Sequence, residues 1–255
     1  MDPTVRQERL PLPPSTGGRV ESAARTHVGK VRRINEDACL DRPDLMLWAV
    51  ADGVGGWHAG DRASNLVVEL LGTVGGEGGA AMLNAVRIQL DQANAQLLQE
   101  AEESGRPSAT TVFVQMIAGR HFACVWAGDS RLYLWRGGQL QQLTRDHTEA
   151  QALADAGLMT LEEAERQTNK NSIARAVGAV ETLELEMIQA GVEDGDVFLL
   201  CTDGLTKMLK DEEIAAAISW AAPPRTIVDT LVDQALERGA IDNVTVIAIR
   251  CVQAG

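Results

Sequence analysis

Four short segments rich in β-branched and aromatic residues follow one another between residues 110 and 143, and this run limits the fold more than any other feature. Only Gly137-Gly138 separates the last two segments, which is typical of a tight hairpin turn. Strands joined by such short connections pair with antiparallel neighbours, so the run predicts an antiparallel meander. The predicted strands are 110–117, 121–127, 132–136 and 139–143.

Hydrophobic periodicity predicts the other elements, and strands and helices come in separate runs instead of in strict alternation. This order favours an α+β fold with antiparallel sheets over a doubly wound parallel sheet. A helix of about twenty residues follows Gly79, and its apolar residues recur at the spacing of a stripe that packs on a core. The polar stretch 147–171 is also predicted to be helical, and Thr160-Leu-Glu-Glu163 has the form of a capping box. Further strands are predicted at 20–28, 45–51, 183–188, 197–201 and 243–250, and further helices at 61–71, 211–219 and 224–238.

The composition is that of a soluble globular protein. Of the 255 residues, 45% are hydrophobic and 23% are charged, which suits one domain with a large core. Residues 1–18 contain four of the eight prolines and end in Gly-Gly, so we expect a flexible N-terminal tail. The folded domain is expected to span residues 19–252.

Charge and cysteine content exclude several classes of function. A formal net charge of -13 argues against a nucleic-acid partner or an anionic membrane surface, because both attract basic proteins. No apolar run approaches the ~18 residues of a membrane-spanning helix, and the N-terminus lacks the layout of a signal peptide, so a cytoplasmic protein is expected. The four cysteines form no Cys-x-x-Cys pair, which predicts reduced thiols and no zinc site.

Acidic residues stand at the ends of several predicted strands, most clearly Asp52 in Val50-Ala-Asp-Gly-Val-Gly-Gly56. Each one alone is more typical of a turn or a helix cap than of a metal ligand. If the strands end at one rim, however, the carboxylates converge there and their repulsion requires bound cations. Oxygen ligands without His or Cys favour Mg²⁺ or Mn²⁺ over zinc. The residues concerned are Glu36, Asp37, Asp52, Asp129, Asp203 and Asp242.

Eight short motifs follow one another in a fixed order between residues 20 and 250. They are Gly29-Lys-Val-Arg-Arg-Ile-Asn-Glu-Asp37, Val50-Ala-Asp-Gly-Val-Gly-Gly56, Ser108-Ala-Thr-Thr111, Ala127-Gly-Asp-Ser-Arg131, Leu143-Thr-Arg-Asp-His-Thr148, Asn171-Ser-Ile-Ala-Arg-Ala-Val-Gly178, Leu200-Cys-Thr-Asp-Gly204 and Asp242-Asn-Val-Thr245. Each is weak alone, but together they resemble the PP2C-type (PPM) metal-dependent serine/threonine protein phosphatases, in particular the small bacterial members. The resemblance implies two antiparallel sheets packed face to face, with helices on both outer faces.

The resemblance also implies a metal centre. In that family an aspartate and a water bridge two metal ions, and Asp52 matches the aspartate. Gly53 would let its own carbonyl approach closely enough to act as a ligand. The bridging water attacks phosphorus directly, without a covalent enzyme intermediate. By motif, Asp203 and Asp242 complete one metal site and Glu36 the other, Asp37 lies beside them, and Asp129 with Asp203 holds a third, weaker ion.

Other residues match the family's substrate-binding features. Arg32 matches the arginine that binds the substrate phosphate, for which a planar guanidinium is well suited. Eukaryotic members have a histidine after the Asp-Gly pair to protonate the leaving oxygen, whereas this chain has Val54. His58 is near in sequence, but a loop histidine is more often solvated than catalytic. Residues 148–172 match a flap beside the active site of bacterial members, and His147 either belongs to it or packs at its base.

The expected function is therefore hydrolysis of phosphoserine and phosphothreonine in proteins with Mn²⁺ or Mg²⁺, in opposition to a bacterial Ser/Thr kinase. The alternative is a catalytically inactive, phosphatase-like module that binds phosphoproteins. Such a module would have lost Asp52, Asp203 or Asp242, and all three are present. Output from a larger sensor is a third hypothesis, which the absence of a recognisable sensory domain weakens. The segment Ser22-Ala-Ala-Arg-Thr-His-Val-Gly29 is similar to members that accompany type VI secretion clusters, where the phosphatase counteracts a kinase acting on a forkhead-associated-domain protein.

Overall fold

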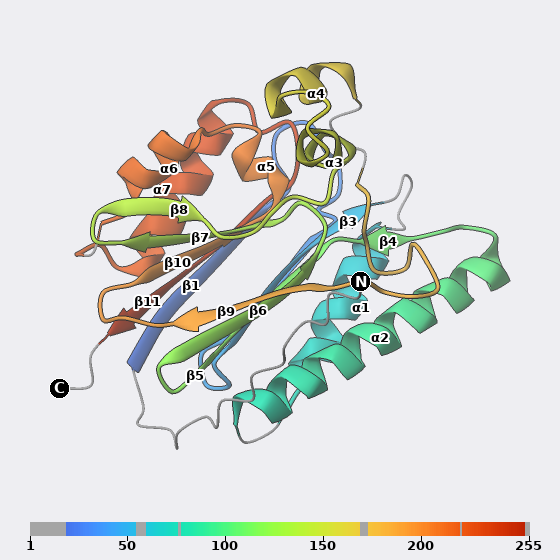
Figure 1. The fold of residues 1–255 in the computed structure, drawn as a ribbon, viewed down its shortest axis with the longest axis horizontal. Helices are drawn as coiled ribbons and strands as arrows, with labels where there is room; N and C mark the ends of the chain where they lie inside the picture. Colours follow the sequence, from blue (N-terminus) through green and yellow to red (C-terminus); the bar gives the residue numbers. More distant parts are fainter. Residues whose placement is uncertain (1–18, 55–59, 76–77, 169–172, 220, 253–255) are drawn as a thin grey trace.

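Two antiparallel sheets packed face to face form the centre of this computed structural model, which describes residues 19–54, 60–75, 78–168, 173–219 and 221–252 (Figure 1). One sheet has the strand order β1-β11-β10-β7-β8, and the other has β2-β3-β5-β6-β9 with β4 paired to β3. The predicted α+β fold is therefore confirmed. The strands are β1 Arg19–His27, β2 Asp37–Arg42, β3 Leu47–Val54, β4 Ala109–Thr110, β5 Val112–Ala118, β6 His121–Ala127, β7 Arg131–Arg136, β8 Gln139–Gln142, β9 Glu186–Gly191, β10 Val197–Cys201 and β11 Val244–Val252.

Helices cover the outer face of each sheet. Figure 1 shows α1 and α2 on the sheet that contains β5, and α6 and α7 on the sheet that contains β11. Helices α3 and α4 stand at one end of the sandwich, at the top of the view. Within the described ranges, none of the helices combines the length and the apolar character that crossing a membrane requires. The helices are α1 Gly60–Gly72, α2 Gly79–Ser104, α3 Glu149–Asp155, α4 Leu161–Gln167, α5 Asp203–Thr206, α6 Asp211–Ala217 and α7 Pro224–Glu237.

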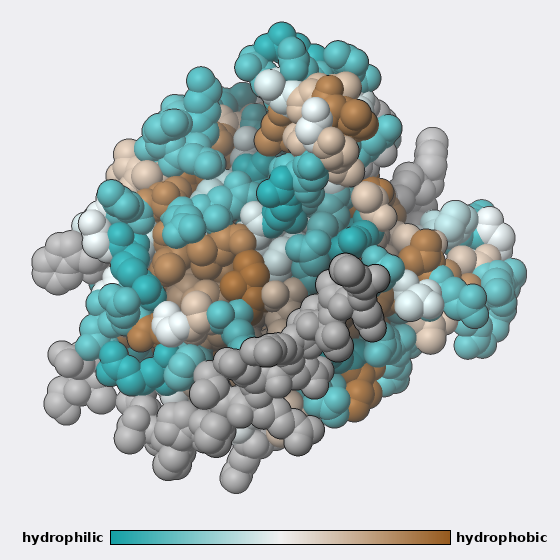
Figure 2. Space-filling view, viewed as in Figure 1, coloured by the Kyte–Doolittle hydropathy of each residue, from teal (hydrophilic) through white to brown (hydrophobic). Residues whose placement is uncertain are grey.

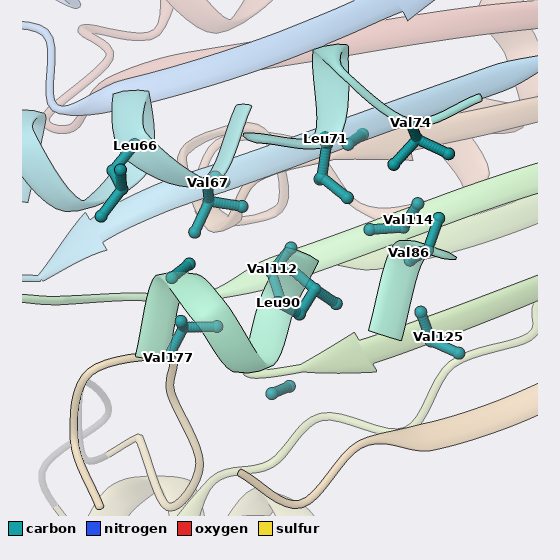
Figure 3. Close-up of a cluster of buried hydrophobic side chains, with 14 of the residues drawn as sticks. Leu66, Val67, Leu71, Val74, Val86, Leu90, Val112, Val114, Val125 and Val177 are labelled. Atoms are coloured by element: carbon teal, nitrogen blue, oxygen red, sulfur yellow. The ribbon is translucent and has the colours of Figure 1, made fainter. Parts of the chain in front are cut away.

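Three groups of buried hydrophobic side chains fill the spaces between these four layers. Figure 3 shows the group between the helices and the sheet of β5, where Leu66 and Leu71 of α1 meet Val86 and Leu90 of α2. The apolar stripe predicted for α2 is thus confirmed. The second group lies under α5 to α7, and the third lies between the two sheets. Central strands have an apolar layer on each face, so a strand such as β10 is a continuous apolar run that is buried throughout.

The four strands predicted between residues 110 and 143 form two hairpins in different sheets, so the prediction of a single meander is wrong. β5 pairs with β6 in one sheet, and β7 pairs with β8 in the other. The chain crosses between the sheets at Gly128, where φ is +122° and an added Cβ would lie 2.4 Å from the Cβ of Thr111. Only glycine fits that crossing. Periodicity shows that a strand is buried but not which sheet it joins.

Some elements differ from the sequence prediction in their presence or their bounds. The pattern did not predict β2, an edge strand of mixed composition, or α5, which has only 4 residues. Strand β9 begins at Glu186, later than the predicted start at residue 183. All four cysteines are free thiols, as predicted. Residues 1–18, predicted to be a flexible tail, lie outside the described residues.

The predicted helical flap at residues 148–172 contains two short helices, α3 and α4. The capping box predicted at Thr160 is present at the start of α4. Leu158 and Leu161 are exposed, and Figure 2 shows hydrophobic residues among hydrophilic ones at the top of the view, where Figure 1 draws α4. Residues 169–172 lie outside the described residues, and the function of the segment as a flap stays a prediction.

Arg131, the first residue of β7, ties the base of this helical segment to the five-stranded sheet. Its guanidinium donates to both carboxylate oxygens of Asp146 at 2.7 to 3.0 Å and to the Tyr133 hydroxyl at 3.1 Å. That hydroxyl donates in turn to Asp211, at the start of α6. The side chains of Arg131 and Asp146 are only 22% and 15% exposed, so water solvates neither charge fully.

We expect Arg131→Met to lower the free energy of unfolding by about 2–3 kcal/mol, because it leaves the Asp146 carboxylate partly buried without its cation. Chemical denaturation followed by circular dichroism measures this difference. Arg120→Met serves as the control, because Arg120 is exposed in the turn between β5 and β6. The control should change the same quantity by less than about 0.5 kcal/mol. Equal losses in the two variants would contradict a special contribution of the Arg131 network.

Candidate metal centre

The predicted site residues lie at one rim of the sandwich, where neighbouring strands begin and end. Asp37 begins β2 and is the register partner of Asp52, near the end of β3. In the other sheet, Cys201 at the end of β10 is partnered with Arg131 at the start of β7 and with Val246 near the start of β11. Antiparallel pairing places the end of each strand beside the start of the next. Four further acidic residues stand just outside these strand ends, namely Glu36, Asp129, Asp203 and Asp242.

The main chain of Asp52 is fixed by two threonines of the Ser-Ala-Thr-Thr motif. The Asp52 N–H donates to the Thr111 hydroxyl at 3.1 Å, and its carbonyl accepts from the Thr110 hydroxyl and the Thr111 N–H, both at 2.9 Å. The hydroxyls of Thr111 and Ser130 lie 3.0 Å apart. This motif therefore positions the carboxylate at the end of β3 and connects it to the turn that carries Asp129.

Asp37 joins the two sheets at the rim. Its Oδ2 accepts hydrogen bonds from the hydroxyls of Thr202 at 2.9 Å and Thr245 at 2.6 Å, which belong to the opposite sheet or follow directly from it. The carboxylate is buried, and burial raises the pKa of Asp37 above its usual value. The resemblance implied that Asp37 stands beside the metal ligands, and its contacts show that it also holds two strands together.

Asn243 holds the loop that carries Glu36. Its side-chain oxygen accepts from the Glu36 N–H at 2.8 Å, and its amide nitrogen donates to the carbonyls of Val28 and Ile34, both at 2.9 Å. The Glu36 carbonyl in turn accepts from the Gly53 N–H at 3.1 Å. A Cβ on Gly53 would lie 2.3 Å from the backbone oxygen of Gly60, so only glycine permits this close approach of backbone segments.

Two positively charged side chains, Arg32 and Lys207, lie among the carboxylates. Arg32 binds Asp242, with Nε 2.9 Å from one carboxylate oxygen and Nη2 3.0 Å from the other. Lys207 Nζ lies 2.5 Å from Asp203 Oδ2 and 2.9 Å from Asp242 Oδ2. The sequence pattern predicted Arg32 as a phosphate ligand but did not identify Lys207, whose position at i+4 from Asp203 is the one signal that could have found it.

The carboxylates repel one another strongly in this arrangement. Burial, together with the charges of Asp37 and Asp203, raises the pKa of Asp52 well above its usual value. Burial and the charge of Asp203 likewise raise the pKa of Asp129. Burial would also raise the pKa of Asp242, but Lys207 and Arg32 hold it below its usual value. Among the residues that the structure describes, Asp203 has only Lys207 as a cationic partner, and burial still raises its pKa above the usual value, whereas Asp242 has two such partners and keeps its charge more easily.

The chemistry of these side chains fits a hard divalent cation. The Oδ1 atoms of Asp37, Asp129 and Asp203 are buried and have no hydrogen-bond partner among the described residues. A buried carboxylate oxygen without a partner costs free energy that a bound cation would offset. Within the described residues, however, no three Asp, Glu, His or Cys side chains stand close enough together in this structure to hold an ion. Asp203 and Asp242 are paired instead with Lys207 and Arg32.

The remaining predictions about single residues have different outcomes. Val54 is partly exposed at the end of β3 and offers no proton donor there. His58 lies outside the described residues. His147 packs at the base of the helical segment, where its Nδ1 accepts from the Gly128 N–H at 3.1 Å and its ring stacks on Trp126. Its structural contacts match the hypothesis that His147 packs at the base of the flap.

Comparison with known proteins gives one family. A family model described as protein phosphatase 2C matches residues 26–238. The serine/threonine protein phosphatase PstP of Mycobacterium tuberculosis is 37% identical over 230 residues, which cover 88% of this chain and 44% of PstP. The chain thus spans less than half the length of this relative.

Two solved structures share the fold. PppA, described as a key regulatory component of T6SS in Pseudomonas aeruginosa, is 40% identical with a TM-score of 0.84, over 91% of this chain and 97% of that one. A structure of the catalytic domain of PstP, described as in complex with 2 manganese ions, is 34% identical with a TM-score of 0.80. It covers 92% of this chain and 99% of that one.

Proposed function

Because this chain belongs to the protein phosphatase 2C family, we propose that it is a metal-dependent hydrolase that removes phosphate from phosphoserine and phosphothreonine in proteins. The observation that supports this most directly is the group of buried carboxylates at one rim of the sandwich. Burial and mutual repulsion raise the pKa of Asp52 and Asp129, and three of the carboxylate oxygens have no partner among the described residues. Several buried carboxylates that repel one another destabilise the fold unless cations balance their charge.

The proposed cofactor is Mn²⁺ or Mg²⁺, with two ions and a third, weaker one. When bound, the ions would activate a water for attack on phosphorus and neutralise charge on the phosphoryl oxygens. The all-oxygen donor set suits either metal, and the related catalytic domain of PstP is described with two manganese ions. The proposed ligands are Asp52 between two ions, the Gly53 carbonyl, Glu36, Asp203 and Asp242, with Asp37 beside them and Asp129 with Asp203 at the third ion.

The chain's own residues supply the positioning. The two threonines fix Asp52, and Asn243 fixes the loop that carries both Arg32 and Glu36. The Arg32 side chain is 48% exposed beside Asp242, so its outer N–H groups can reach a phosphate group that enters from solvent. A guanidinium binds phosphate with two parallel hydrogen bonds, which would orient the phosphoryl group toward the carboxylates.

The inactive phosphoprotein-binding module is less well supported. Asp52, Asp203 and Asp242 are all present and lie at the same rim, whereas an inactive module has no need to keep them. For the cellular role, we propose opposition to a Ser/Thr kinase that acts on a forkhead-associated-domain protein. The likeness to PppA, a T6SS regulator, supports this assignment.

Phosphate release from p-nitrophenyl phosphate and from a phosphothreonine peptide tests the proposed activity. We expect turnover with Mn²⁺ or Mg²⁺, none in EDTA, and recovery when metal is restored. Arg32→Ala should raise KM for the peptide about tenfold or more, because one bidentate phosphate contact is lost. Arg33→Ala is the matched control, since Arg33 is the exposed neighbour, and it should change KM little. A folded protein that binds Mn²⁺ but hydrolyses neither substrate would favour the inactive module.

A further inference from the structure

Lys207 follows α5 and lies between two of the proposed metal ligands. Its Nζ is 2.5 Å from Asp203 Oδ2 and 2.9 Å from Asp242 Oδ2. Asp203 is the first residue of α5 and Asp242 stands just before β11, so the ammonium group bridges two segments that are distant in sequence. It thus lies between two carboxylates that would otherwise repel each other across the rim.

Few other groups are available to balance those carboxylates. Asp203 Oδ1 has no hydrogen-bond partner in the described part of the chain, so Lys207 supplies the favourable contact at its other oxygen. Asp242 has Arg32 as a second partner, but Arg32 is the more exposed cation, at 48% against 25% for Lys207. A shielded ion pair is stronger than an exposed one, because less water screens it.

A lysine is an unusual neighbour for residues that bind divalent cations. The same oxygens cannot bind an ammonium group and a metal ion at full strength, and two positive charges so close together repel. Lys207 has a flexible stem and is a quarter exposed, so it can leave toward solvent when a stronger cation arrives.

We propose that Lys207 is a built-in counter-ion for Asp203 and Asp242, which stabilises the protein without metal and must be displaced when a divalent cation binds. The proposal rests on the metal centre of the proposed function. Lys207 weakens metal binding and so sets the metal concentration at which the centre fills. Without metal, its two ion pairs keep the repulsion between Asp203 and Asp242 from destabilising the fold. It is a positioning residue, because it acts through the two carboxylates.

Mn²⁺ binding to full-length protein tests the proposal, with isothermal titration calorimetry as the readout. Lys207→Met removes the charge and keeps much of the stem, and we expect it to lower the Mn²⁺ dissociation constant at least fivefold, at the low end of typical coupling between two ligands (about 5–150-fold). In EDTA the same variant should melt at a lower temperature than wild type, since the carboxylates lose their cation. The variant should therefore bind Mn²⁺ more tightly and yet be less stable without metal. A lysine with a merely structural role would not give this combination.

Lys30→Met is the matched control, because Lys30 is an exposed lysine on the loop that precedes Arg32. It removes the same charge near the same rim and should leave the Mn²⁺ dissociation constant within about twofold of the wild-type value. Lys207→Gln provides a second neutral variant if Lys207→Met does not fold. Loss of folding by both neutral variants in EDTA, together with recovery in Mn²⁺, would itself support the counter-ion role.

Two results would overturn the proposal. Equal Mn²⁺ affinity in wild type and Lys207→Met, with a raised KM for phosphopeptide, would show that Lys207 contacts the substrate instead. Weaker Mn²⁺ binding in the variant would show that Lys207 organises the ligands for metal. Both results leave the phosphatase function intact, whereas absence of Mn²⁺ binding by wild type and variants alike would reject the metal centre itself.

Discussion

The Asp52→Asn variant should lose activity toward p-nitrophenyl phosphate to below about one thousandth of the wild-type rate, and should also melt at a higher temperature in EDTA. The activity falls because the amide removes the charge that is proposed to lie between two ions. The stability rises because Asp52 is buried beside other carboxylates, which raise its pKa well above the usual value. Each unit of such a shift corresponds to ~1.4 kcal/mol that the folded state loses when the group is charged.

A thermal melt in EDTA and in Mn²⁺, with the phosphatase assay alongside, measures both parts of this prediction. In Mn²⁺ the order of melting temperatures should reverse, since the wild type gains binding free energy that the variant lacks. Asp91→Asn is the control, because Asp91 is an exposed carboxylate on α2. It should alter neither activity nor melting appreciably. A variant that is less stable than wild type in EDTA would show that Asp52 contributes to folding without metal.

Gly204→Ala is expected to prevent normal folding, with a loss of more than about 4 kcal/mol in the free energy of unfolding. A Cβ on Gly204 would lie 1.8 Å from the carbonyl oxygen of Asn243, and the obstacle is backbone that cannot rotate away. Any shift that relieves the clash moves Asn243, whose side chain holds the Glu36 loop. The substitution should therefore remove metal binding together with stability.

Chemical denaturation and Mn²⁺ titration of the same sample measure these two effects of Gly204→Ala. Gly75→Ala is the matched control, because nothing lies within 4 Å of a Cβ added there. Since alanine restricts the unfolded chain more than glycine does, the control should leave stability unchanged or raise it by up to about 1 kcal/mol. A Gly204→Ala protein with wild-type stability would mean that the contact between α5 and the start of β11 is loose.

The sequence predicted most elements because the two central sheets impose local patterns. Strand β10 is buried throughout and reads as an unbroken apolar run, and the helix α2 shows its stripe at Val86 and Leu90. The capping box at Thr160 was also predicted correctly, since both of its residues belong to one short motif. Local chemistry is enough to identify such features.

Elements that depend on distant contacts were missed. The crossing at Gly128 sends β7 to the other sheet, and no local pattern distinguishes it from an ordinary hairpin turn. Strand β2 is half-buried at a sheet edge, so the alternation of apolar and polar residues in its sequence is too weak to predict a strand. Pairing partners are set by the packing of the whole chain, and hydrophobic period alone does not report them.

In the candidate site, too, the sequence predicted the features that depend on local motifs and missed those that depend on distant contacts. The motifs predicted which carboxylates stand at strand ends, and the structure places Asp37 and Asp52 as register partners. The pairing of Arg32 with Asp242 joins residues at opposite ends of the chain, and so no spacing rule indicates it. The contribution of Asn243 as the support for the Glu36 loop is likewise visible only from its three hydrogen bonds.

The pairing of β1 with β11 sets the order of events during synthesis. Every residue of β1, from Arg19 to His27, is partnered with a residue of the last strand, and Figure 1 shows the two strands side by side. Ribosomes add roughly 5–20 residues per second, so β1 spends many seconds without its partner, as an unprotected strand edge. Asp203 and Asp242 also emerge late. The five-stranded sheet and the rim that carries these two aspartates can therefore be completed only after β11 has been synthesised.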